Sequence, residues 1–423
     1  MLRSFSALIL LLCYLICCQN STIHKVELQK TETGYQLLRD GDPFFINGAG
    51  ANGHYDLLAD YGGNSIRTWG VDQWEETFQQ AEKVGLTVCA GLWLEQERQG
   101  FDYSDPDTVQ MQFDKLKKWI LKYKDHPSLL MWGIGNELDL QYTNVKVWDA
   151  VEEVAKYIHE VDGCHPTMTA TAFIEKDEVN QIKEKCPHID ILCINAYAGI
   201  PVLSQFLNDF GWNKPYILGE WGPMGHWEVG QTSWNAPIEF TSTEKAALYI
   251  NHYKHITKDP NCLGGYVFLW GYKQERTATW YSLFLSDGEK TEAVDVLSML
   301  WKGEWPDNRA PRLDSLKLNR KTAAEQLIFN AGNKLTANVL THDPDNDSLK
   351  IVWEILNEST QNSIGGDEEN KPMMIPGLII QQKEQSLTFQ APQEEGAYRL
   401  FVTVYDQEGS GAHANIPFYV KKN

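Results

Sequence analysis

The chain has 423 residues, of which 43% are hydrophobic and 22% charged, and its formal net charge is −20 at pH 7. The apolar content is sufficient for a sizeable core, and the length predicts one large and one small domain. The acidic balance, without a clustered basic run, excludes a protein that binds nucleic acid through the phosphate backbone. A neutral or cationic ligand fits this charge better.

The first residues resemble an export signal. Arg3 is followed by an apolar run of about ten residues from Ala7 to Ile16, which is too short to span a bilayer at about 20 residues. Residues 15–18 (Leu-Ile-Cys-Cys) resemble a loose bacterial lipobox, in which Cys18 becomes the lipidated N-terminus. We therefore expect residues 1–18 to be a lipoprotein-type signal peptide and the protein to be at the bacterial cell surface or outer membrane. A periplasmic or secreted protein, or an uncleaved anchor, is the alternative.

Five cysteines follow the signal region, and they show no Cys-x-x-Cys spacing: Cys89, Cys164, Cys186, Cys193 and Cys262. The odd number and irregular spacing indicate neither a zinc cluster nor a full disulfide framework. Cys89 and Cys193 lie within apolar runs and are expected to be packed thiols. One pair among the others could be oxidised after export.

From about residue 40 to residue 305, strand-like apolar runs alternate with segments of helical periodicity, which indicates parallel β/α units. The runs are residues 44–47, 65–69, 87–94, 129–135, 167–172, 189–197, 216–219 and 265–270. One intervening helix is expected to begin at Asp105-Pro106, a cap residue followed by proline in the first helical position. Eight such units predict a (β/α)8 TIM barrel, which we assign to residues 22–305.

The pattern changes after residue 310. Short alternating runs at 334–340, 349–355 and 398–405 are separated by turn-rich stretches. Residues 310–423 are therefore expected to form a small all-β immunoglobulin-like sandwich. Asp343, Asp345 and Asp347 alternate like the oxygen ligands of a calcium loop, but the residues between them favour a plain turn. We expect the turn, and neither a metal nor a cofactor.

The segment from Gly48 to Gly53 (Gly-Ala-Gly-Ala-Asn-Gly) matches the dinucleotide-binding pattern and follows a predicted strand. The acidic residue that this fold requires at the end of the second strand is missing, because that position holds Arg67-Thr-Trp. A doubly wound sheet also does not account for eight β/α units. The glycines are expected to form a tight loop at the end of the first strand.

Two apolar runs each lead into a glutamate: residues 129–137 end in Glu137, and residues 215–220 end in Glu220. A carboxylate at the tip of a buried strand loses hydration unless it is partnered, so stability alone seldom explains it. Strands 4 and 7 would bring both glutamates to the mouth of the barrel, where barrel enzymes carry their catalytic residues. Glycoside cleavage uses such a pair, one as acid and one as nucleophile. Ion pairs at the barrel rim are the alternative.

Asn136-Glu137 and Glu220 resemble the signature of clan A of the retaining glycoside hydrolases. The resemblance implies that Glu137 is the acid/base and Glu220 the nucleophile. Arg67, Tyr197 and Trp270, at the tips of expected strands 2, 6 and 8, agree with it.

The resemblance also assigns supporting residues. Arg67 and Tyr197 would hold the nucleophile, Asn136 would bond the sugar 2-hydroxyl group, and Trp270 would form the floor of the central subsite. A cation and a hydroxyl beside Glu220 would keep that carboxylate ionised, while the less compensated Glu137 would have the raised pKa of an acid. A rim salt bridge is the alternative for Arg67, and core packing is the alternative for Tyr197 and Trp270.

Further substrate contacts are expected near the other strand tips, because aromatic rings form platforms for sugars. The candidates are Trp69, Trp93, Glu95, Trp221, Trp227 and His54, with His226 and Trp234 in the loop after Glu220. Packing within the loops explains any one of them equally well.

A barrel followed by one sandwich resembles the bacterial endo-β-1,3-glucanases of glycoside hydrolase family 158. The main expectation is therefore a monomeric endo-β-1,3-glucanase that cleaves laminarin-type β-glucan by double displacement. It would contact the membrane only through a lipid anchor. The alternatives are a β-mannanase or β-galactosidase type of the same clan, a β-glucan transglycosylase, and a non-catalytic surface glycan-binding protein.

Overall fold

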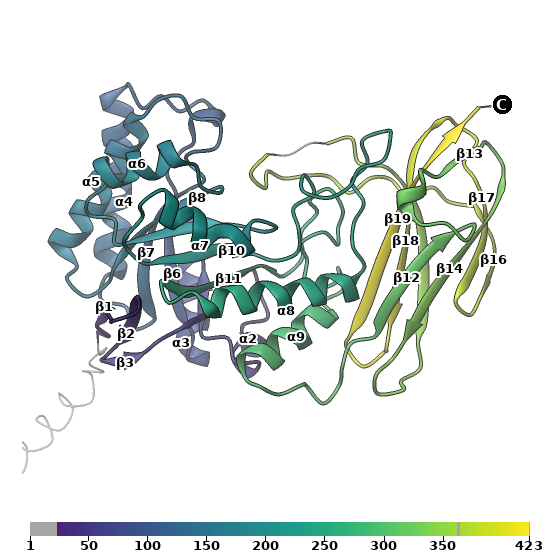
Figure 1. The fold of residues 1–423 in the computed structure, drawn as a ribbon, viewed down its shortest axis with the longest axis horizontal. Helices are drawn as coiled ribbons and strands as arrows, with labels where there is room; N and C mark the ends of the chain where they lie inside the picture. The colour runs from purple at the N-terminus through teal and green to yellow at the C-terminus, as the bar shows by residue number, and fades with distance from the viewer. Residues whose placement is uncertain (1–22, 362–363, 423) are drawn as a thin grey trace, which may run out of the picture.

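A computed structural model describes residues 23–361 and 364–422 of the chain (Figure 1). The expected signal peptide and Cys18 lie outside these residues. Among the helices within the described ranges, none is both long and apolar enough to cross a membrane.

Eight parallel strands close into a barrel in the order β10-β11-β4-β5-β6-β7-β8-β9. They are β4 (Ile46–Ala51), β5 (Ser65–Arg67), β6 (Thr87–Leu92), β7 (Leu129–Asn136), β8 (Thr167–Thr171), β9 (Ile191–Asn195), β10 (Tyr216–Trp221) and β11 (Cys262–Trp270). Each corresponds to one of the apolar runs in the sequence, and the predicted TIM barrel is confirmed.

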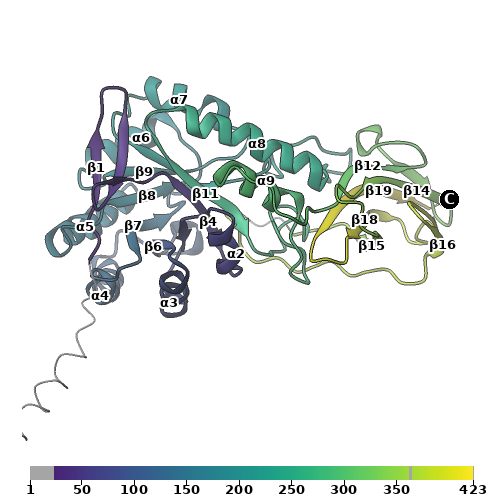
Figure 2. The ribbon, with the colours of Figure 1, turned by 90° about the horizontal axis from the view of Figure 1, so that it is seen from below.

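Helices on the outside of the barrel connect the strands (Figure 2). They are α2 (Tyr55–Asp60), α3 (Trp74–Val84), α4 (Pro106–Tyr123), α5 (Lys146–Val161), α6 (Lys176–Lys185), α7 (Ile200–Asp209), α8 (Ser242–Lys258) and α9 (Glu292–Trp301), with a short 3-10 helix η1 (Glu97–Gln99) after β6. Helix α4 begins as expected, with Pro106 as its first residue and the Asp105 side chain accepting a hydrogen bond from the Asp107 N–H at 3.0 Å.

A three-stranded antiparallel sheet precedes the barrel and was not expected from the sequence. It consists of β1 (Val26–Lys30), β2 (Tyr35–Arg39) and β3 (Asp42–Pro43). Val26 and Leu37 belong to the same buried cluster as residues of the barrel interior, including Leu130, Cys89 and Cys193. The small sheet therefore adds to the barrel core, and both cysteines are packed thiols as predicted. All five cysteines in the described part of the chain are free.

The glycines of the Gly48-Ala-Gly50 segment lie within β4, not in the loop expected for them. A Cβ atom on Gly48 would lie 2.4 Å from the ring of Tyr266, and one on Gly50 would lie 2.7 Å from the indole of Trp69. Glycine is required here because large side chains pack directly on the strand backbone. This packing accounts for a pattern that otherwise resembles a dinucleotide-binding loop.

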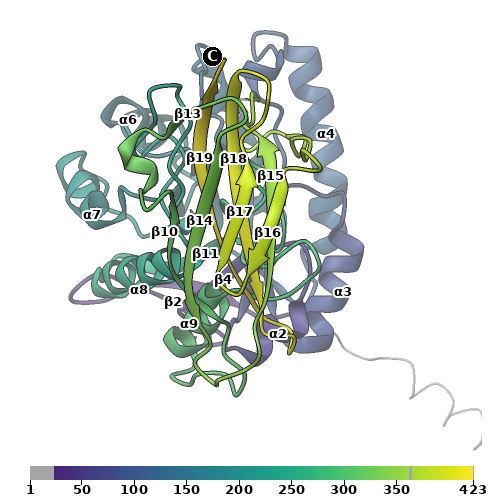
Figure 3. The same cartoon turned by 90° about the vertical axis from the view of Figure 1, so that its right-hand side faces the viewer.

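The second domain consists of two four-stranded sheets that share one buried cluster (Figure 3). One sheet has the order β12-β14-β17-β16 and the other the order β13-β19-β18-β15. The strands are β12 (Arg312–Leu318), β13 (Ile328–Asn330), β14 (Lys334–His342), β15 (Lys350–Asn357), β16 (Ile379–Lys383), β17 (Ser386–Gln390), β18 (Gly396–Tyr405) and β19 (Gly411–Lys421), and a 3-10 helix η2 (Ala323–Glu325) follows β12. Strand β14 alternates strictly between buried and exposed residues, which is typical of a sheet with one solvated face.

Buried polar groups join the second domain to the barrel. Arg399 of β18, which is 2% exposed, donates to the carbonyl of Pro237 at 2.9 Å. Asn415 of β19 donates to the carboxylate of Glu239 at 2.5 Å. Breaking these bonds would leave polar groups buried without partners, which is costly. The bonds therefore favour one arrangement of the two domains.

Candidate active site

The two glutamates lie at the carboxyl end of two barrel strands, β7 and β10, which are separated by β8 and β9. Glu220 is part of β10, and Glu137 directly follows β7. Their exposed fractions are 8% and 9%, so both carboxyl groups are largely removed from water. Glu137 has the left-handed backbone torsion φ of 50°, which is unusual for a residue other than glycine and directs the chain sharply away from the strand.

Three donors surround the carboxylate of Glu220. Trp69 Nε1 lies 2.7 Å and Arg67 Nη1 3.3 Å from Oε1, while the hydroxyl of Tyr197 lies 3.1 Å from Oε2. Donors of this kind stabilise the charged form of a carboxylate and hold it in one orientation. The structure therefore places Trp69, Arg67 and Tyr197 around Glu220.

A buried amide network links Glu220 to Glu137. Arg67 donates to Asn136 Oδ1 at 2.6 Å and to Asn195 Oδ1 at 3.2 Å. Asn195 Nδ2 in turn donates to Asn136 Oδ1 at 3.3 Å and to Glu137 Oε1 at 2.8 Å. Asn136 is thus part of the network that orients both glutamates. Its expected bond to a sugar hydroxyl group stays a prediction.

The environment of Glu137 favours its neutral form. Burial, and next the negative charge of Glu220, raise the pKa of Glu137 to about 8, against the opposing effect of the Asn195 hydrogen bond. A carboxyl group with this pKa holds its proton at neutral pH and releases it under mildly basic conditions. It is suited to act as a general acid and then as a base.

Gly219, the residue before Glu220, makes this packing possible. A Cβ atom on Gly219 would lie 2.6 Å from Asn195 Oδ1 and 2.9 Å from Arg67 Nη1. Neither group has room to retreat, because both are buried. The site therefore depends on a residue that has no side chain of its own.

Aromatic side chains border the pair. Tyr197 and Trp227 form an edge-to-face contact with ring centroids 6.0 Å apart, and Trp227 is 57% exposed. Phe268 contacts Trp69 edge-to-face at 5.8 Å and belongs to the same buried cluster as Tyr281. Trp227 is thus exposed beside Tyr197, and its contact with a substrate stays a prediction.

Two tryptophans expected to contact substrate lie in the core. Trp270 is fully buried, donates its indole N–H to the carbonyl of His54, and stacks with Trp301. Trp221 is 1% exposed and packs against Tyr249. The pairing of β11 with β4 shifts register between Val267 and Trp270, and this irregularity changes which residues of the strand tip face the barrel axis.

The remaining candidates lie at the edge of the site or away from it. Trp93 is half-buried beside Gly70, and Glu95 is exposed, with its backbone N–H bonded to Gln112. His54 stacks on Phe284 with centroids 4.0 Å apart. His226 lies against the Trp227 and Trp280 rings, and Trp234 packs against Tyr419 of the second domain.

Sequence reasoning missed Asn195, Phe268 and a loop of the second domain. Asn195 ends an apolar strand, as Glu137 and Glu220 do, and that signal was available. Gly365, in the loop between β15 and β16, lies beside Glu137: a Cβ atom on it would be 3.1 Å from Glu137 Oε2. Nothing in the local sequence of this loop indicates a place beside a barrel residue far away in the chain.

Part of the barrel is similar to a known family. Residues 53–258 match the model described as glycosyl hydrolases family 2, TIM barrel domain. A β-glucuronidase of Streptococcus agalactiae is 24% identical over 265 residues, which are 53% of this chain and 41% of that protein. A β-galactosidase of Vibrio vulnificus is 25% identical over 137 residues, which are 28% of this chain and 13% of that protein. The chain spans less than half the length of these relatives.

Solved structures share the fold. A β-glucuronidase of Ruminococcus gnavus has a TM-score of 0.52 at 17% identity, over 67% of this chain and 54% of that chain. An FMN-binding β-glucuronidase of Facaelibacterium prausnitzii has a TM-score of 0.52 at 14% identity, over 94% of this chain and 59% of that chain. At sequence identities this low, the similarity shows only a shared fold. Residues 53–258 are thus similar to the TIM barrel domain of the glycosyl hydrolases family 2. This similarity supports the expected clan of retaining glycoside hydrolases but not the narrower likeness to family 158.

Proposed function

We propose that the protein is a retaining β-glycosidase in which Glu220 is the nucleophile and Glu137 the acid/base. The observation that carries this proposal is the difference between the two carboxyl groups. Glu220 accepts hydrogen bonds from Trp69, Arg67 and Tyr197, whereas the pKa of Glu137 is raised to about 8. Double displacement at an anomeric carbon requires one carboxylate held in place as the nucleophile and one carboxyl group that carries a proton as the acid.

In the first step, a carboxylate oxygen of Glu220 bonds to the anomeric carbon as the glycosidic C–O bond breaks. The leaving oxygen takes the proton of Glu137. In the second step, water attacks the same carbon and gives a proton to Glu137, while the ester bond to Glu220 breaks. The sugar is released with its original β configuration, and both carboxyl groups return to their starting states.

Two sugars are the first candidates for the glycone. The named relatives are β-glucuronidases and a β-galactosidase, so we propose a β-glucuronide or a β-galactoside as substrate. The endo-β-1,3-glucanase suggested by the order of domains is the competing specificity. Export through residues 1–18, lipidation of Cys18 and a monomeric state stay predictions.

A panel of substrates tests the proposal. The purified protein is incubated with the 4-nitrophenyl β-glycosides of glucuronic acid, galactose, glucose and mannose, and separately with laminarin. We expect release of 4-nitrophenol from one of the first two, with the β-anomer of the sugar formed first in the proton NMR spectrum. Shortened laminarin products would favour the glucanase, and elongated products a transglycosylase. Binding of glycans without any turnover would contradict an enzymatic function.

A nucleophile variant tests the roles. Glu220→Ala should lose turnover, and added azide should restore it with a glycosyl azide as product, because azide occupies the space left by the carboxylate. Full activity of Glu220→Ala without azide would contradict the assignment of the nucleophile.

A further inference from the structure

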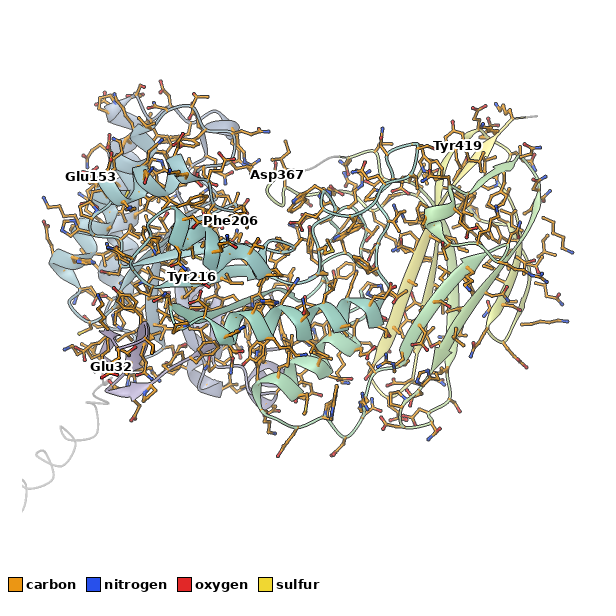
Figure 4. The ribbon with its side chains drawn as sticks, viewed as in Figure 1. Glu32, Glu153, Phe206, Tyr216, Asp367 and Tyr419 are labelled. Carbon is orange, nitrogen blue, oxygen red and sulfur yellow. The ribbon has the colours of Figure 1, made fainter. Side chains whose placement is uncertain are left out.

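Residues 364–367, in the loop between β15 and β16 of the second domain, lie at the mouth of the barrel. Figure 4 shows Asp367 at the end of this loop that lies toward the barrel. Gly365 and Gly366 precede it with φ angles of 62° and 75°, and both lie against charged barrel side chains. Glycine adopts these left-handed torsions without strain. Because it also has no side chain, the backbone can approach the barrel closely.

Barrel residues hold this loop from two sides. Arg98, whose side chain is 6% exposed, donates to both oxygens of Asp367 at 3.0 and 3.2 Å. On the other side, Lys273 Nζ donates to the Gly366 carbonyl at 2.6 Å and to Glu275 at 2.7 Å. A bidentate arginine–carboxylate pair fixes orientation as well as distance. The loop is therefore attached to the barrel segments that follow β6 and β11.

The loop lies beside the position that the leaving group must take. A general acid must be within hydrogen-bond reach of the oxygen that it protonates, so in the proposed reaction the leaving oxygen lies beside the Glu137 carboxyl group. A Cβ atom on Gly365 would lie 3.1 Å from Glu137 Oε2 and 2.9 Å from Arg98 Nη2. The backbone of the loop thus occupies one side of that carboxyl group.

We propose that residues 364–367 form the wall of the leaving-group subsite, and that this wall restricts the enzyme to short leaving groups such as a small aglycone or one sugar. The proposal rests on the proposed retaining reaction, because it uses the position of the acid to locate the leaving group. A long glycan leaving group would have to pass through the Arg98–Asp367 pair. The second domain therefore takes part in substrate selection and not only in the stability of the barrel.

The test compares leaving groups of increasing size on one glycone. The glycone that the wild type accepts is offered with a 4-nitrophenyl group, with one sugar and with a tetrasaccharide, and kcat/KM is measured for each. Asp367→Ala removes the ion pair at an exposed residue. We expect the ratio of kcat/KM for the tetrasaccharide to that for the 4-nitrophenyl substrate to rise at least about fivefold, within the usual range for altered pocket contacts.

Two further variants make the test specific. Glu368→Ala removes the same charge from the adjacent exposed position and should keep the wild-type ratio. Exchanging the charges in the double variant Arg98→Asp, Asp367→Arg should restore the pair and return the ratio toward that of the wild type. Thermal unfolding of each variant shows that the fold is retained.

The outcomes separate the two proposals. The proposed wall would be contradicted if Asp367→Ala left the ratio of kcat/KM values unchanged, or if the wild type had the same kcat/KM for all leaving groups. Neither outcome would contradict the retaining reaction. A wild type that turns over none of the substrates would instead overturn the reaction itself, and the wall with it.

A separate observation concerns a carboxylate cluster in the second domain. One oxygen each of Asp343, Asp347 and Asp406 lies within 4.8 Å of the others. Asp343 Oδ1 accepts the backbone N–H groups of Asp345 and Asp347 at 2.8 and 3.1 Å. Its Oδ2 is buried and has no hydrogen-bond partner among the described residues, in a side chain only 8% exposed.

We infer that this cluster binds Ca²⁺. A buried carboxylate oxygen without a donor is costly, and hard cations with carboxylate, carbonyl and water ligands provide the missing partner. Asp406 also accepts the Asn308 side-chain amide at 2.9 Å. An ion would therefore connect the β14–β15 turn, the β18–β19 turn and the segment that follows the barrel.

Thermal unfolding of the full-length chain with calcium chloride or with a chelator tests the site. We expect Ca²⁺ to raise the Tm, with a saturation curve that also gives the affinity. Asp343→Asn and Asp347→Asn should abolish the rise, while Glu408→Gln, which removes a nearby exposed charge, should keep it. The same Tm with calcium and with chelator, or a rise that persists in Asp347→Asn, would overturn the site.

Discussion

The side-chain amide of Asn195 lies 2.8 Å from Oε1 of Glu137 and accepts a hydrogen bond from Arg67, which also contacts Glu220. One asparagine thus connects the two carboxyl groups that the proposed reaction needs. Because its N–H bonds to the carboxylate form of Glu137, it opposes the burial that raises the pKa of this group.

Asn195→Ala should therefore change the pH dependence as well as the rate. Loss of the hydrogen bond raises the pKa of Glu137 further, so the basic limb of the kcat/KM profile should move to higher pH. The released Glu137 side chain should lower kcat/KM by about 100-fold, since small misplacements of a catalytic group have effects of this size. A lower rate with an unmoved basic limb would show that Asn195 acts only through packing.

Glu137→Gln should stabilise the fold at basic pH. The folded pKa of Glu137 is raised from 4.5 to about 8, so the folded state binds more protons than the unfolded state between these values. Stability is then greatest below about pH 4.5 and falls as pH rises to about 8, by an amount of the order of a few kcal/mol. The Tm of Glu137→Gln relative to wild type should increase over this range. A constant difference from pH 5 to pH 9 would contradict the raised pKa.

Gly219→Ala should reduce activity without touching either glutamate. The added methyl group would lie 2.4 Å from Cys193 Sγ and 2.6 Å from Asn195 Oδ1, so the network around Glu220 has to shift. We expect kcat/KM to fall by about 100-fold and the Tm to fall as well. Gly163→Ala is the matched control, because nothing lies within 4 Å of its added methyl group. Wild-type kinetics for Gly219→Ala would contradict the close packing.

Trp69 and Trp270 should respond differently to substitution. Trp69→Phe removes the N–H that lies 2.7 Å from Glu220 and should lower kcat by about 100-fold, as loss of one preorganised donor does, while the fold persists. Trp270→Ala removes a fully buried ring and should cost about 3 to 5 kcal/mol of unfolding free energy. Denaturant unfolding and steady-state kinetics measured on both variants distinguish the roles. If Trp270→Ala were stable but inactive, this result would instead support the substrate contact that the sequence predicted for Trp270.

Periodicity in the sequence was sufficient for the barrel and for the position of its acidic pair. Hydrophobic strands of a parallel barrel are read as continuous apolar runs, and a glutamate at the end of such a run is conspicuous. The small first sheet escaped detection because its strands have few buried residues. In β1 (Val26–Lys30) only Val26 is buried, and β3 (Asp42–Pro43) has no buried residue. Trp270 and Trp221 were misplaced because a strand tip with shifted register no longer follows simple alternation.

The sequence alone determined the fold of the barrel, the all-β character of the second domain and the identity of Glu137 and Glu220 as the residues to consider, because these depend on local patterns of apolar and polar residues. Only the tertiary structure decided which side chains surround each glutamate, and hence that the pKa of Glu137 is raised. It also decided that Gly365, from the second domain, lies beside Glu137. Contacts between residues hundreds of positions apart are set by how the domains pack, and no local pattern records them.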